Sequence, residues 1–154
     1  MGVSAMAKPS TVRLFGLLVV IAGAIMVVAG AVTWFTVKSQ LADEQITVSD
    51  DAAHFAGQPV NGPFTAYAQA NVIEMHTMNI TGNKTYAQLD KEDPARQTAM
   101  TSSFLRSSLF TSVVAFGVAF MAAGIGIVLI LIGLALKALA GALPAPNAPP
   151  VAST

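Results

Sequence analysis

The fold of this chain is decided by two stretches that contain no charged residue and no histidine, LFGLLVVIAGAIMVVAGAVTWFTV at residues 14–37 and LFTSVVAFGVAFMAAGIGIVLILIGLAL at residues 109–136. The hydrocarbon core of a bilayer is about 30 Å thick, and about 20 helical residues at 1.5 Å each cross it. Because backbone groups find no water there, a spanning segment has to be helical. The sequence therefore predicts an all-α membrane protein, a hairpin of two transmembrane helices.

Composition agrees with a chain that lies largely in lipid. Hydrophobic residues make up 54% of the 154 residues and charged residues 10%, against about 25% charged residues in an ordinary soluble domain. The chain has no cysteine, which excludes a disulfide framework, a thiolate nucleophile and a Cys-ligated metal. We expect the lipid bilayer to be its main partner.

Charge divides the chain into five segments. All eight acidic residues lie between the two stretches, where the net charge is −3, while Lys8 and Arg13 precede the first stretch and only Lys38 closely follows it. Basic residues at the first span usually mark its cytoplasmic end. We expect a multi-pass plasma-membrane protein with both termini cytoplasmic. Its segments are residues 1–13 as the cytoplasmic N-terminus, 14–37 and 109–136 as the spans, 38–108 as a small, mostly helical extracytoplasmic segment, and 137–154 as a cytoplasmic Pro-rich disordered tail.

The first stretch has an alternative interpretation as a cleaved signal peptide, because basic residues precede it and Ala29-Gly30-Ala31 resembles a cleavage site. Its apolar run is longer than the usual 7 to 15 residues of a signal core, and it continues through Trp34 and Phe35. We therefore favour an uncleaved anchor. Trp34 and Phe35 are then expected at the outer interface, where aromatic rings are enriched.

Turn and cap signals punctuate the segment between the spans. Ile46-Thr47-Val48 is a short β-prone piece, and Pro63 suits the first turn of a helix that starts an apolar stripe at Phe64. Thr81-Gly82-Asn83 should end that helix. Asp93-Pro94 is a good helix start, and nothing breaks the pattern after it until Gly141, which predicts one long helix that includes the second span.

Small residues form a stripe on each predicted span. Such residues let helix backbones approach closely in lipid, where packing drives association, and a heptad spacing fits a left-handed crossing. The two stripes could pack on each other as an antiparallel hairpin, or one could be offered to another transmembrane protein or to a second copy of the chain. The predicted helix-packing residues are Gly16, Gly23, Gly30, Ser112, Ala115, Ala119, Ala122, Gly126 and Gly133.

Candidate chemistry is sparse. Two histidines and one carboxylate can hold non-haem iron, but Glu74 and His76 are two residues apart, which on a helix points them in nearly opposite directions. We find no metal-binding, catalytic or phosphate-binding motif and no basic patch for nucleic acid. We therefore expect no catalytic residues, no metal, no cofactor and no enzymatic activity.

A set of motifs along residues 14–133 is characteristic when its members are taken together. They are Trp34, Val37, Leu41, Glu44, Ile46-Thr47-Val48, Asp51-Ala52, Gly62-Pro63-Phe64, Ala66, Ala70, His76, Thr85-Tyr86-Ala87, Ser103-Phe104-Leu105-Arg106, Ser108-Leu109-Phe110 and Val113-Val114-Ala115-Phe116-Gly117. The set resembles a group of short actinobacterial two-span membrane proteins that are often labelled aromatic ring-opening dioxygenase. The resemblance implies an envelope protein of uncharacterised function.

These observations favour a non-enzymatic accessory or assembly subunit of a plasma-membrane complex, which acts by helix packing and extracytoplasmic contacts. The alternative is an extracytoplasmic ligand-binding or sensing module anchored by the two spans. Its binding residues would be His54, Phe64, Tyr67 and His76. A pocket at these residues would favour the binding module, and a flat surface would favour the accessory role.

Overall fold

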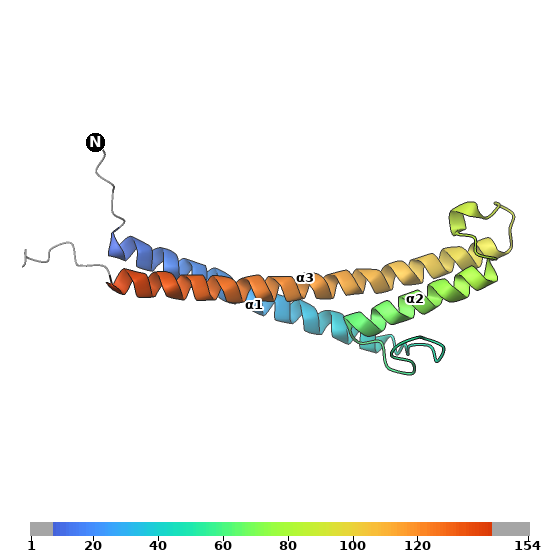
Figure 1. Ribbon diagram of the computed structural model, residues 1–154, viewed down its shortest axis with the longest axis horizontal. Coiled ribbons are helices and arrows are strands. Elements are labelled where there is room, and N and C mark those ends of the chain that lie inside the picture. The colour runs from blue at the N-terminus through green and yellow to red at the C-terminus, as the bar shows by residue number, and fades with distance from the viewer. Residues whose placement is uncertain (1–7, 143–154) are drawn as a thin grey trace, which may run out of the picture. The chain divides into compact units, whose positions relative to one another are not determined.

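Helices account for almost all the regular structure of the chain (Figure 1). The computed structural model describes residues 8–142, and in this range the elements are α1 (Pro9–Asp43), α2 (Pro63–Ile80), the 3₁₀ turn η1 (Tyr86–Gln88) and α3 (Ala95–Ala142). Helices α1 and α3 contain the two charge-free stretches and are long and apolar enough to cross a membrane. The prediction of an all-helical chain with two such helices is confirmed for the described range.

The long helices extend beyond the predicted spans at both ends. Residues 9–13 belong to α1, and residues 137–142, which the sequence segmentation placed in the disordered tail, form the last turns of α3. The rest of that predicted tail, 143–154, lies outside the described residues. Contacts divide the chain into two compact units, of which unit 1 holds residues 8–30 and 121–142 and unit 2 holds residues 31–120.

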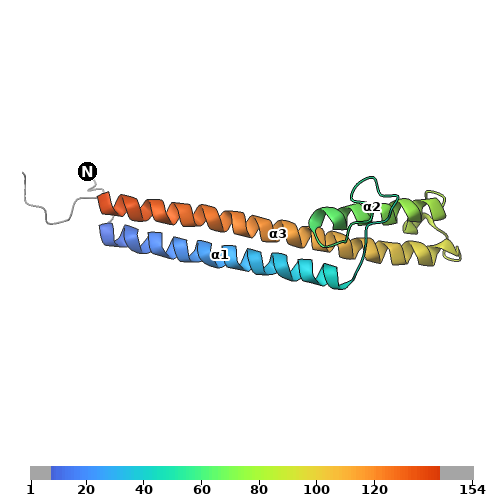
Figure 2. The same ribbon diagram turned by 90° about the horizontal axis from the view of Figure 1, so that it is seen from below.

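Unit 1 is an antiparallel pair of helices held at glycines (Figure 2). A Cβ atom built on Gly23 would lie 2.5 Å from the carbonyl oxygen of Gly126, and one on Gly126 would lie 2.6 Å from that of Gly23. The same reciprocal relation joins Gly16 and Gly133, at 2.8 and 2.6 Å. A side chain at any of these four positions would push the backbones apart. Within unit 1, the small-residue stripes are therefore used by the hairpin itself.

The other residues of the predicted stripe differ in burial. Gly30 and Ala119 are buried, whereas Ser112, Ala115 and Ala122 are half-buried. Two large residues of α3, Leu109 and Phe116, are buried as well. Their burial was not predicted, because the stripe was chosen for small side chains alone.

Unit 2 has a core of larger side chains. Phe116 is 1% exposed, and its ring makes an edge-to-face contact with the Trp34 ring, with centroids 4.7 Å apart. Trp34, which was expected at the lipid interface, is thus half-buried against protein, while Phe35 is exposed. Ala66 and Ala70, both fully buried, bring α2 into the same core. Figures 1 and 2 show α2 beside the first half of α3, and the two helices run in opposite directions.

The connection from α1 to α2 folds back on itself. Thr47 and Pro59 form an isolated antiparallel bridge, beside which the amide of Val60 donates to the carbonyl of Ile46 at 2.8 Å. Val48 and Val60 are each 1% exposed and join the core. The β-prone piece of the sequence is thus paired, but the pairing is too short to make a strand.

The predicted helix boundaries of unit 2 agree with the structure to within one residue, since α3 begins at Ala95 and not at Pro94. Pro63 is the first residue of α2, and α2 ends before Gly82, whose φ of +62° is the left-handed conformation that glycine adopts at little cost. At the start of α3, the Asp93 carboxylate accepts a hydrogen bond of 2.8 Å from the amide of Ala95. The first amide groups of a helix have no acceptor within the helix, and the Asp93 side chain supplies an acceptor for one of them.

Gly126→Ala is expected to destabilise the protein, because the new Cβ would collide with backbone atoms of α1. Overpacking of this kind typically costs about 1–3 kcal/mol. Gly124→Ala adds the same methyl group to the same helix at a place where nothing lies within 4 Å, so its stability should not fall. Unfolding of the full-length protein by heat or denaturant in mild detergent compares the two. An equal effect of both substitutions would contradict the glycine contact as the basis of the pairing.

Candidate functional site

A groove of about 470 Å³ lies between the connection that follows α1 and one face of α2. The connection contributes residues 51–55. The helix contributes positions spaced by three and four, which lie on one face: Phe64, Tyr67, Ala68, Asn71, Val72 and Met75. The volume falls in the range of small-molecule sites, which is about 300–1,000 Å³.

The groove combines an apolar wall with a few polar groups. Phe64 is 74% exposed, and Tyr67 and Met75 are exposed as well, so large apolar side chains face open space here. The polar groups among the lining residues are those of Asp51, His54, Asn71 and the Tyr67 hydroxyl. An apolar surface with few polar groups is the usual composition of a ligand pocket.

Three of the four predicted binding residues meet in this groove, because His54, Phe64 and Tyr67 all line it. His76 does not line it, but it bonds to Asp51, which does. Sequence reasoning missed Phe55 and Asp51. Met75, which belongs to the apolar stripe that starts at Phe64, was not related to binding either.

Phe55 lies in a strained backbone conformation at the edge of the groove. Its φ is +63°, a left-handed value that bulky side chains rarely adopt and that costs about 1–3 kcal/mol. The surrounding turn holds it there, because the amide of Gln58 donates to the Phe55 carbonyl at 3.0 Å and the amide of Gly57 donates to Val48 at 2.9 Å. Strained residues of this kind cluster at functional sites.

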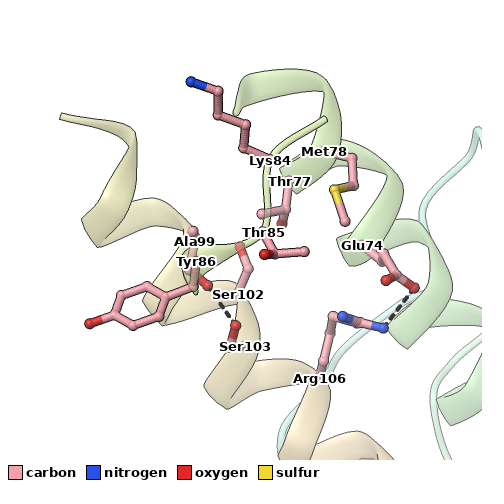
Figure 3. A pocket seen from close by; sticks show the side chains of 10 residues that line it. All are labelled: Glu74, Thr77, Met78, Lys84, Thr85, Tyr86, Ala99, Ser102, Ser103 and Arg106. Carbon is pink, nitrogen blue, oxygen red and sulfur yellow. Dashed lines mark hydrogen bonds and ion pairs between the residues drawn. The ribbon is translucent and has the colours of Figure 1, made fainter. Parts of the chain in front are cut away.

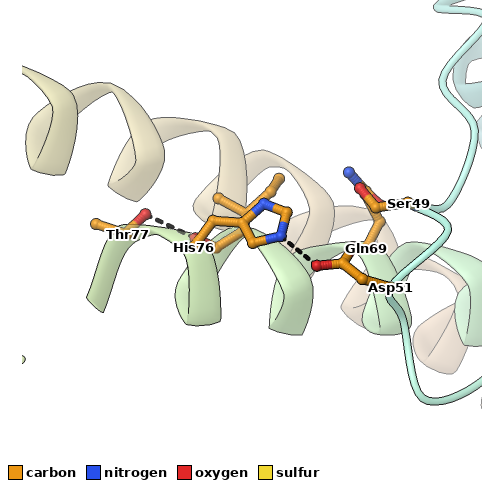
Figure 4. Close-up of polar contacts among 6 residues, drawn as sticks. Ser49, Asp51, Gln69, His76 and Thr77 are labelled. Carbon is orange, nitrogen blue, oxygen red and sulfur yellow. Dashed lines mark hydrogen bonds and ion pairs between the residues drawn. The ribbon is translucent and has the colours of Figure 1, made fainter. Parts of the chain in front are cut away.

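Two polar contacts tie the connection to α2 (Figure 4). His76 Nε2 lies 2.6 Å from Asp51 Oδ2, and the amide of Ser49 donates to Gln69 Oε1 at 3.0 Å. The hydrogen bond from His76 lowers the pKa of Asp51 below its ordinary value. An ionised carboxylate only accepts hydrogen bonds, so Nε2 carries the proton in this pair. The polar end of the groove therefore carries a carboxylate charge.

A smaller pocket of about 80 Å³ lies between α2 and α3 (Figure 3). Arg106 pairs with Glu74 at 2.6 Å there, and its Nε is buried without a hydrogen-bond partner within residues 8–142. The hydroxyls of Thr77 and Ser103 donate to backbone carbonyls of their own helices. Its volume is well below the range of small-molecule sites, which is about 300–1,000 Å³. We interpret this pocket as the surroundings of an ion pair that joins the two helices.

The described residues contain no group of three or more His, Cys, Asp or Glu side chains placed to hold a metal ion. Glu74 and His76 have separate partners, Arg106 and Asp51. The structure therefore does not place Glu74 and His76, which the sequence analysis considered as metal ligands, in one site.

No family model, curated protein or solved structure matches this chain. The resemblance to short actinobacterial membrane proteins stays a prediction. Many of the residues on which it rests, such as Trp34, Leu41, Val48, Ala66 and Phe116, belong to the core of unit 2 or pack against it. That resemblance therefore concerns packing more than chemistry.

Asp51→Asn should destabilise the attachment of the connection to α2 at neutral pH. Because the folded-state pKa of Asp51 is lowered, its stabilising contribution is present above the ordinary carboxyl pKa and is lost as the pH falls through the lowered value. The difference between wild type and variant should therefore close in acid. Limited proteolysis of the connection across this pH range measures it, with the exposed neighbour substitution Asp50→Asn as control. A difference that stays constant into strong acid would contradict a role for the ionised Asp51 carboxylate in this contact.

Proposed function

We propose that this protein is a membrane-anchored module that binds a ligand in the groove between residues 51–55 and α2. The observation that carries the proposal is the groove itself, which has the size and composition of a ligand site. It contains three residues that the sequence had selected for binding, and a strained phenylalanine lies at its edge. A flat surface at these residues would have favoured the accessory role instead.

The anchor is the pair of long helices, and several observations support its insertion in a plasma membrane. In each helix, only 17% of the most apolar window is buried, whereas a core helix of a soluble protein would be mostly buried. The apolar side chains that remain exposed, such as Ile25 and Val28 on α1 and Leu131 on α3, would face lipid. In this proposal both termini are cytoplasmic and residues 38–108 are extracytoplasmic.

An accessory role in a membrane complex is the second candidate, and a specific surface favours it. Phe104 and Leu105 are 67% and 51% exposed on the part of α3 that precedes the charge-free stretch. Two large apolar residues in water are a feature of protein contact sites. Within unit 1, the small-residue stripes no longer support this role, because the two helices of the hairpin pack on each other through Gly16, Gly23, Gly126 and Gly133.

Topology is tested by reporter fusions in cells. A reporter fused after Thr154 should be active only in the cytoplasm, and one inserted near Asn83 should be active only outside. Asn83 is exposed and adopts a φ of 62° in the turn after α2, so an insertion there disturbs little packing. The opposite pattern in both fusions would reverse the orientation, and a mature chain that begins near Val32 would indicate cleavage of a signal peptide.

Occupation of the groove is tested by thiol labelling, for which the chain is well suited because it has no cysteine of its own. Met75→Cys places the single thiol in the groove, and Ile80→Cys places it on an exposed part of α2 that is not among the groove's lining residues. In native membranes, maleimide should label Met75→Cys more slowly than in the purified protein, while Ile80→Cys labels at the same rate in both. Equal rates for Met75→Cys in both preparations would contradict a bound ligand.

A further inference from the structure

The register between α2 and α3 relates the groove to the predicted span. Glu74 pairs with Arg106, and the ring of Tyr67 meets the ring of Phe110 with centroids 5.9 Å apart. The two helices are therefore antiparallel in unit 2, and Tyr67 lies level with the second residue of the charge-free stretch 109–136. Phe64 lies three residues earlier on α2, which is about 4.5 Å further toward the interior of that stretch.

The polarity of the groove changes along the same direction. Its end toward the predicted span carries Phe64 and Tyr67, while its opposite end, near Met75, lies beside the loop residue Asp51, which reaches His76 of α2. From Phe64 to Met75 the helix rises about 16 Å. The groove is thus apolar where the bilayer would begin and charged where water would begin.

The charge at the outer end restricts what can bind. Asp51 contributes the only carboxylate among the lining residues, and no Lys or Arg lines the groove in the described range. The segment 38–108 also carries a net charge of −3. An anionic group at this end would meet repulsion and no Lys or Arg to offset it, whereas a hydroxyl could donate a hydrogen bond to the carboxylate and a cationic ammonium group, with or without an N–H, would be attracted to it.

We propose that the groove takes a membrane lipid from the outer leaflet, with an acyl chain along Phe64 and Tyr67 and a headgroup without net negative charge at Asp51. The proposal rests on the proposed binding function and names its ligand class. It follows from the register that places the apolar end level with the span, from the exposure of Phe64, and from the carboxylate at the far end. A lipid already in the bilayer would enter the groove from the side, without crossing water.

The test uses the full-length Met75→Cys protein in vesicles of phosphatidylcholine, which is zwitterionic, or of phosphatidylglycerol, which is anionic. Maleimide should label the thiol several-fold more slowly in phosphatidylcholine. The Ile80→Cys protein should label equally in both, which controls for reagent access at the vesicle surface. Adding Asp51→Asn to Met75→Cys should remove the difference between the two lipids, while Asp51→Glu should retain it, and the fluorescence of the single Trp34 reports whether each variant is folded.

Each outcome separates this inference from the proposed function. Equal labelling of Met75→Cys in both vesicles and in detergent would overturn the lipid assignment. If native membranes still protected the thiol, the binding function would stand with another ligand. Stronger protection by phosphatidylglycerol would overturn the headgroup assignment, and loss of protection in native membranes as well would remove the binding function itself.

Discussion

Direct backbone contact between Gly23 and Gly126, repeated one heptad away at Gly16 and Gly133, sets the distance between the two helices of unit 1. In the bilayer that we propose for these helices, apolar side chains would gain nothing by leaving one apolar environment for another, so close packing would have to hold the helices together. Glycine permits the closest approach, because no Cβ separates the backbones. The cost is that glycine is required at four positions, because a Cβ atom built at any of them would lie within 3.2 Å of a carbonyl oxygen and an amide nitrogen of the other helix.

Unit 2 solves a different packing problem with larger side chains. Here α3 has two neighbours, so Phe116 fills the space beside Trp34 while Ala66 and Ala70 let α2 approach. The bridge between Thr47 and Pro59 places Val48 and Val60 in the same core. These contacts hold the connection in place, and the bond from His76 to Asp51 fixes the middle of the connection on α2. The groove is the space that remains between two elements held in this way.

The proposed function depends on that fixed geometry. A loop held only by its ends could close over the exposed face of α2, whereas this connection is attached through buried valines and through Gln69 and His76. The strain at Phe55 is maintained by the hydrogen bonds of the same turn. A preformed apolar groove binds without the ordering cost that a flexible segment would incur.

The sequence by itself determined the two long helices, because uninterrupted apolar stretches of this length have few alternatives to a helix. It also determined the ends of α2 and the start of α3, since Pro63, Gly82 and Asp93 act through their own backbone or side-chain chemistry. Likewise, the glycine heptads identified the face along which the helices of unit 1 meet. The sequence also singled out His54, Phe64 and Tyr67 as binding residues, but it did not show how they are arranged around the groove.

Only the tertiary structure decided that Phe64, Tyr67 and Met75 face open space while Val72 of the same helix is buried. An apolar stripe has the same sequence pattern whether it meets a core or a groove. It also decided that His76 bonds to Asp51 and Glu74 to Arg106, partners 25 and 32 residues away along the chain. Such pairs arise only when separate elements are packed together, because periodicity describes one helix and carries no information about which segment lies against it.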